Sequence, residues 1–168
     1  MSSFLEKLGS YHILTNLLPG AFFMLTSRGF FGIGLPTANV AEDIVVFYFV
    51  GLIINRIGSL IVEPALKRCS FVKFAPHADY IKAVSIDSKI DVLSETNILL
   101  RTLLTCVILL PIIKLADIMY SKFPIIMQNF SWVIIILLIA LFLFAFKKQS
   151  DYIRKRVEAV NSQPAKDK

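Results

Sequence analysis

The chain has 168 residues, of which 56% are apolar, and its mean hydropathy is +0.69. Soluble domains are roughly 45–50% apolar, so the composition excludes an ordinary soluble protein and predicts an integral membrane protein of the all-α class. A formal net charge of +6 is also found in nucleic-acid-binding proteins. In a membrane protein such a charge more often reflects basic cytoplasmic loops, and we expect no direct contact with nucleic acid.

The apolar residues come in long runs, and about 20 such residues cross a bilayer. We expect a single membrane domain over 1–168 with four transmembrane helices, at about 11–31, 44–62, 98–119 and 125–146. The third is the weakest, because only the twelve residues 102–113 separate Arg101 from Lys114. At 1.5 Å per residue they cover about 18 Å, so both charged ends would have to extend toward the headgroups.

The distribution of Lys and Arg predicts how the chain is oriented. Basic residues concentrate in the loop 63–97 and in the tail 147–168, and few lie in the other connections. Because cytoplasmic loops carry the excess of Lys and Arg, we expect a multi-pass protein of the bacterial inner (plasma) membrane with both termini in the cytoplasm. The N-terminal segment lacks a signal-peptide cleavage pattern and is expected to be retained. Cys69 and Cys106 are expected to be free thiols in a reducing compartment.

The loop 63–97 and the tail are the sizeable parts outside the expected spans. After Pro76 the apolar residues follow a helical rhythm with charges between them, which predicts an amphipathic cytoplasmic helix. This helix either continues into the third transmembrane helix or ends before a new start capped by Ser94 or Thr96. Charged residues of the loop and tail form a candidate surface for a soluble protein partner or for anionic lipid: Lys82, Asp87, Lys89, Asp91, Arg154, Lys155 and Arg156.

Several polar residues fall in the cytoplasmic half of the expected helices. They are Asn16, Asn55, Arg56, Glu63, Asn97 and Arg101. Because a charge in the hydrocarbon costs about 2.5–3.5 kcal/mol on insertion scales, these residues predict a polar layer that ties the helices together near the cytoplasmic surface. Two alternatives remain: the arginines only extend to the headgroups, or the residues form a ligand or ion site. Gly51 and Gly58, with Ser59, are small enough to let helices approach closely and are the expected packing positions.

The sequence contains no recognisable catalytic constellation. His12 and His77 stand alone without metal-ligand spacing, and no phosphate-binding or nucleophile motif occurs. We therefore expect no enzyme activity, no catalytic residue, no bound metal and no cofactor.

Three stretches carry a resemblance to known proteins: "LTNLLPG" (14–20), "NRIGSLIVEP" (55–64) and "DYIKAVSIDSKIDVLSETNILLR" (79–101). In these the chain resembles small bacterial inner-membrane proteins with four helices that are encoded beside a soluble partner in antiphage defence operons, such as the membrane subunits of Kiwa systems. The resemblance implies a homo-oligomeric membrane sensor that holds a soluble cytoplasmic partner. It implies no catalytic residues.

The combined expectation is a non-enzymatic, homo-oligomeric sensor or scaffold of the inner membrane. Two other functions fit the same sequence. One is an ion channel or membrane-disrupting effector, whose polar residues would line a pore. The other is a structural subunit of a larger membrane complex.

Overall fold

The structure is a computed structural model that describes residues 2–32, 39–87, 89–122 and 130–161; the side chains described are those of 13–32, 39–76, 78–87, 89–122 and 132–159. Every element in these ranges is helical, which confirms the all-α class. In chain order the elements are α1 (Ser2–Phe31), α2 (Val40–Ile57), the π-helical turn η1 (Gly58–Val62), α3 (Glu63–Arg68), α4 (His77–Ile86), α5 (Lys89–Lys122) and α7 (Phe130–Asn161).

Side-chain caps set two of the helix starts. The Asn39 side chain accepts a hydrogen bond from the backbone N–H of Glu42 and so begins α2. The Asp87 carboxylate accepts from the backbone N–H of Lys89 at 2.9 Å and begins α5. Each cap satisfies a donor that the first turn of a helix leaves free.

The helix break in the loop 63–97 therefore lies at Asp87. The alternative start at Ser94 or Thr96 does not occur, because the Thr96 hydroxyl bonds the Val92 carbonyl of its own helix. The helix α5 runs without interruption from the loop into the apolar segment.

Three helices are long and apolar enough to cross a membrane: Val40–Arg68, Lys89–Lys122 and Trp132–Ala159. They contain the expected spans at 44–62 and 98–119 and most of the one at 125–146, whose residues 125–129 lie outside the described ranges. The expected span at 11–31 forms most of α1 but does not reach the same hydropathy. The polar residues Thr15, Asn16, Ser27 and Arg28 account for this.

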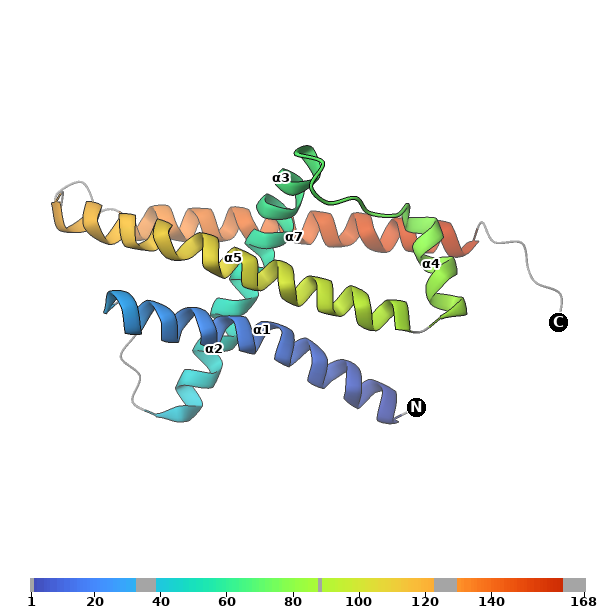
Figure 1. Cartoon of the computed structure of the whole chain (residues 1–168), viewed down its shortest axis with the longest axis horizontal. Coiled ribbons are helices and arrows are strands. Elements are labelled where there is room, and N and C mark those ends of the chain that lie inside the picture. Colours follow the sequence, from blue (N-terminus) through green and yellow to red (C-terminus); the bar gives the residue numbers. More distant parts are fainter. Residues whose placement is uncertain (1, 33–38, 88, 123–129, 162–168) are drawn as a thin grey trace.

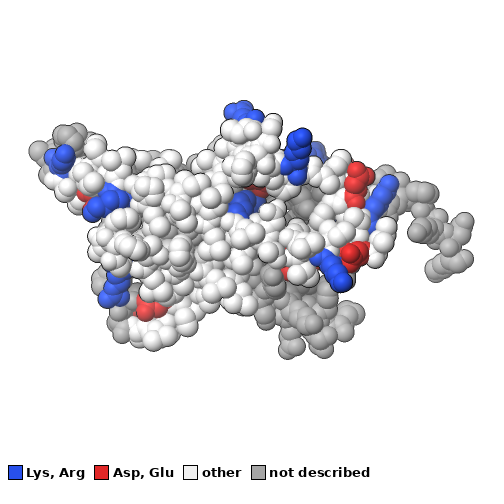
Figure 2. Space-filling model, in the orientation of Figure 1, with Lys and Arg blue, Asp and Glu red and all other residues white. Residues whose placement is uncertain are grey.

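The helices α5 and α7 are longer than a bilayer core requires. At 1.5 Å per residue, the 34 residues of α5 measure about 51 Å and the 32 residues of α7 about 48 Å, against a hydrocarbon core of about 30 Å. The basic tail expected from residue 147 continues α7 as a helix to Asn161, and residues 162–168 lie outside the described ranges. Figure 2 shows charged side chains toward the two ends of the molecule, with further ones at its top and near its middle, and mostly uncharged surface elsewhere on this face.

The helices do not all run alongside one another. In Figure 1, α1, α5 and α7 extend in a similar direction, and the continuous helix α2–η1–α3 crosses them steeply. Helix α1 packs on α2 and α5, and α4 packs on α7 and α5. Helix α7 makes a small contact with α2, and it is the least buried of the three long apolar helices.

Two glycines allow the crossing of α1 and α2. A Cβ atom on Gly20 would overlap the Phe47 carbonyl oxygen, and one on Gly51 would overlap the Asn16 carbonyl oxygen. The two backbones therefore touch directly, as small residues permit in membrane helices. Gly51 is thus a packing position within the chain.

The residues buried around this crossing are partly polar. Thr15, Asn16, Ser27, Thr102 and Thr105 are buried, whereas most of the large apolar side chains of α1, α5 and α7 are exposed. A small apolar cluster of Phe23, Ile54 and Cys106 completes the interior. Exposed apolar and buried polar side chains are the distribution expected of helices surrounded by lipid.

We expect Gly51→Ala to lower the free energy of unfolding by about 1–3 kcal/mol or more, because neither backbone can move away from the added methyl group. The matched control is Gly29→Ala in α1, where a Cβ atom meets nothing within 4 Å, and the gain in helix propensity should leave stability unchanged or slightly higher. Thermal unfolding in mild detergent, followed by circular dichroism, measures both. Equal melting temperatures for the two variants would contradict the close packing at Gly51.

Candidate functional site

The guanidinium group of Arg101 on α5 joins side chains from two other helices. It donates one hydrogen bond to the Asn55 side-chain oxygen at 2.8 Å and another to the Glu63 carboxylate at 2.5 Å. The Asn55 amide in turn donates to the Asn16 side-chain oxygen on α1 at 3.0 Å. Four of the predicted polar-layer residues thus form one network that connects α1, α2, α3 and α5.

Lys148 connects α7 to the same network. Its ammonium group donates to the Ser59 carbonyl oxygen at 2.5 Å and to the Ser59 hydroxyl at 2.8 Å. It also lies 3.8 Å from the Glu63 carboxylate. Sequence reasoning placed Lys148 in the basic tail and did not assign it to this site.

The Ser59 carbonyl is free to accept from Lys148 because of the π-helical turn. In this turn the Glu63 N–H bonds the Gly58 carbonyl, five residues back, instead of the Ser59 carbonyl four residues back. The next residue, Pro64, has no N–H to donate. The Ser59 carbonyl therefore receives neither the α-helical nor the π-helical backbone bond, and the Lys148 ammonium replaces the missing donor. The proline was the signal in the sequence that could have indicated this.

The π turn also decides which polar residues share a face. In a regular α-helix, Arg56, Ser59 and Glu63 would form one stripe at i, i+3 and i+7. A π turn inserts about one extra residue, which rotates everything after it by about 100°. Glu63 consequently lines up with Asn55, eight residues before it, and both reach Arg101.

The structure does not bring Arg56 or Asn97 into the network. Arg56 is half-buried and Asn97 is exposed, and neither side chain forms a hydrogen bond or ion pair with another described residue. For Arg56 the reason is the rotation at η1, which leaves it on a different face from Glu63. Arg101, and not Arg56, is the arginine that contacts Asn55 and Glu63. The placement of Arg56 agrees with the alternative in which its side chain only extends toward the headgroups.

The small residues next to the network have separate roles. A Cβ atom on Gly58 would lie 2.6 Å from the Thr105 hydroxyl and 3.7 Å from the Arg101 Nε atom, so Gly58 lets α5 approach η1. The Ser59 hydroxyl accepts a hydrogen bond from Lys148. The Thr105 hydroxyl is satisfied by the Arg101 carbonyl of its own helix.

Positive charge exceeds negative charge around Glu63. Its carboxylate contacts three cations, namely Lys67 at 2.8 Å, Arg101 and Lys148. Glu63 and Arg101 are only 13% and 18% exposed, whereas the Lys67 and Lys148 side chains are 45% and 42% exposed. The cluster therefore has a shielded ion pair at its base and two accessible ammonium groups.

The predicted partner surface lies apart from this network. We call α4, the start of α5 and the end of α7 the charged unit, because α4 packs on both longer helices beyond their apolar parts. Within it, Asp91 accepts a hydrogen bond from the Tyr80 hydroxyl at 3.2 Å, and Asp87 caps α5. These two carboxylates therefore hold the unit together.

The basic members of the predicted surface are accessible. Lys82, Lys89, Lys155 and Arg156 are exposed, and Arg154 is exposed with Asp151 and Glu158 as partners on its own helix.

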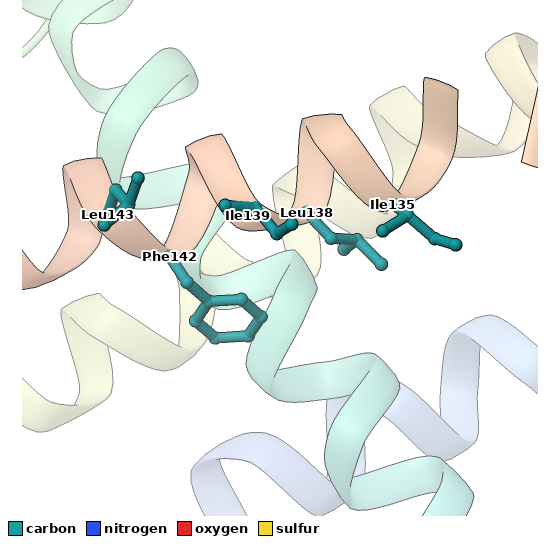
Figure 3. Close-up of a pocket in the computed structure, with 5 residues that line it drawn as sticks. All are labelled: Ile135, Leu138, Ile139, Phe142 and Leu143. Atoms are coloured by element: carbon teal, nitrogen blue, oxygen red, sulfur yellow. The ribbon is translucent and has the colours of Figure 1, made fainter. Parts of the chain in front are cut away.

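The site offers little for redox or metal chemistry. The described part of the chain holds no group of three or more His, Cys, Asp or Glu side chains that could bind a metal ion, and both cysteines are free. A groove on α7 is lined by Ile135, Leu138, Ile139, Phe142 and Leu143 (Figure 3), none of which has a polar side chain. Such a groove suits an acyl chain or another apolar helix.

Comparisons with protein-family models, with curated proteins and with solved structures find no match to this chain.

We expect Arg101→Leu to lower the free energy of unfolding by about 2–3 kcal/mol. Removing one partner of a fully buried ion pair costs about 3–5 kcal/mol, and here Lys67 and Lys148 still compensate Glu63. Arg56→Leu removes the same charge in the neighbouring helix and should change stability by no more than about 0.5 kcal/mol. Thermal unfolding of both variants in one detergent tests this difference, and a larger loss for Arg56→Leu would contradict the network.

Proposed function

We propose that this protein is a non-enzymatic, homo-oligomeric scaffold or sensor of the bacterial inner membrane that holds a soluble cytoplasmic partner. The observation that carries the proposal is the continuity of α5 and α7. Both helices run without a break from apolar segments into the charged unit. The Arg101–Glu63–Lys148 contacts lie where these parts meet. A displacement of the membrane helices would therefore be transmitted to the surface that a partner contacts.

We further propose that α1 is a fourth transmembrane helix, which places both termini in the cytoplasm. Its polar residues Thr15, Asn16 and Ser27, which lower its hydropathy, are buried against neighbouring helices. Its apolar residues, such as Leu18, Phe22 and Leu25, are exposed. An average of the hydropathy over α1 does not distinguish its buried polar face from its exposed apolar face. Lipid would contact only the exposed apolar face.

The geometry supports a scaffold better than a channel. The network that joins the helices lies at one level, on the cytoplasmic side of the apolar segments. Thr102 and Thr105, farther along α5, direct their hydroxyls to carbonyl groups of their own helix. A conducting path would need polar groups along its length, and beyond this level the described helices bury only the hydroxyl groups of Ser27, Thr102 and Thr105. The antiphage role rests on the resemblance in residues 14–20, 55–64 and 79–101.

The topology proposal predicts that Ser3→Cys, in a protein whose own two cysteines are replaced by serine, is shielded from a membrane-impermeant maleimide in intact spheroplasts. Four spans place the N-terminus in the cytoplasm beside the tail, whereas three spans place it outside. Lys122→Cys is the positive control, because it lies at the outer end of α5 in both cases. Labelling of Ser3→Cys as strong as that of Lys122→Cys would show three spans.

The scaffold proposal predicts that tagged protein, purified in mild detergent from its host, carries one soluble protein in a fixed ratio. Exchanging Lys82 and Lys155 for Glu should reduce that partner at least about tenfold, because like-charge contacts at an interface are strongly unfavourable. The matched control is Lys122→Glu at the other end of α5. Native mass spectrometry gives the ratio. Equal recovery from both proteins would mean that the charged unit does not hold a partner.

A further inference from the structure

We propose that the two accessible ammonium groups that contact Glu63, together with the rings of Phe71 and Phe74, bind the phosphate headgroup of an anionic phospholipid. This inference requires membrane insertion but not the soluble partner. The site consists of Lys67, Lys148, Phe71 and Phe74, and we call it the lipid site.

The cluster around Glu63 carries more positive than negative charge, which favours binding of an anion. Lys67 and Lys148 contact opposite oxygens of the Glu63 carboxylate, whose negative charge is already matched by Arg101. The two lysine charges therefore remain in excess, and each side chain is nearly half exposed. A phosphate group can accept hydrogen bonds from two ammonium groups at once.

The turn after α3 holds the aromatic part of the site in place. Ser70 has a positive φ of 56°, the Phe71 N–H bonds the Leu66 carbonyl and the Ser70 N–H bonds the Lys67 carbonyl. These two bonds form a Schellman motif, which ends a helix and turns the chain sharply. The turn is therefore ordered, although the Phe71 side chain that it carries is 80% exposed.

The chain after the turn returns to the basic cluster. The Lys67 ammonium lies 4.2 Å from the centre of the Phe74 ring, close enough for a cation–π contact. The same lysine contacts Glu63. The Phe74 ring and the Lys67 ammonium thus adjoin one another, and the Lys148 ammonium lies at the same carboxylate as Lys67.

The depth of the site selects a lipid as the occupant. Glu63 and Lys67 lie near the end of the apolar helix Val40–Arg68, and Lys148 is the second residue after the apolar run that ends at Phe146. Side chains at such ends of apolar segments lie at the level of the lipid headgroups. At this level aromatic rings anchor a membrane protein and lysine side chains bind anionic lipid.

The test is native mass spectrometry of the full chain in detergent, titrated with phosphatidylglycerol or with phosphatidylcholine. Phosphatidylglycerol should bind preferentially. Lys67→Gln should weaken its binding about fivefold, the effect of losing one basic residue at an anionic surface. The exposed i,i+4 pair of Lys67 with Glu63 contributes little to folding. The matched control is Lys82→Gln, which removes the same charge from exposed α4 and should leave binding unchanged.

A second variant separates the lipid site from general charge attraction. Phe71→Ser keeps every charge and alters a side chain that is mostly exposed, so it should weaken binding of phosphatidylglycerol without affecting folding. Loss of binding in Lys67→Gln and in Phe71→Ser, but not in Lys82→Gln, would support the proposal. Equal binding of the two lipids, or equal losses in Lys67→Gln and Lys82→Gln, would overturn it.

Discussion

The carboxylate of Glu63 is the contact on which the arrangement of the helices depends. It lies on α3 and binds Arg101 of α5 and Lys148 of α7, and Arg101 extends the contact through Asn55 to Asn16 of α1. A charged group near the hydrocarbon is stable only if its partners satisfy it. Each helix that supplies a partner is therefore held at this level, including α7, which has little other contact with the membrane helices.

The local cause of this arrangement is a backbone defect with two consequences. The π turn at Gly58–Val62 rotates Glu63 onto the face of Asn55, and with Pro64 it leaves the Ser59 carbonyl without a backbone donor. The first consequence brings two acceptors to Arg101. The second provides an acceptor for Lys148, because an unsatisfied carbonyl in an apolar setting costs several kcal/mol. Such turns are frequent at functional sites, and here the turn brings α5 and α7 to the same acidic residue, Glu63.

The distribution of polarity links the fold to the proposed function. Polar side chains of α1 and α5 face inward and apolar ones outward, as in helices surrounded by lipid, whereas the ends of α5 and α7 carry charges. The steep crossing of α2 over the other helices (Figure 1) follows from backbone contact at Gly20 and Gly51. Transmembrane helices tilt from the bilayer normal by only about 20° on average. If all these helices span a bilayer, both α2 and the helices that it crosses must therefore be tilted.

The sequence by itself determined the helical class, the positions of three apolar helices and the identity of most network residues. These depend on hydropathy and on charge, which are properties of the residues. It could not determine that Arg101, and not Arg56, joins Asn55 to Glu63, since a regular helical repeat misplaces every residue beyond the π turn. Nor could it assign Lys148, whose role depends on a carbonyl 89 residues away. Only the tertiary structure decided these points, because they depend on one extra residue in a helical turn and on which helices meet there.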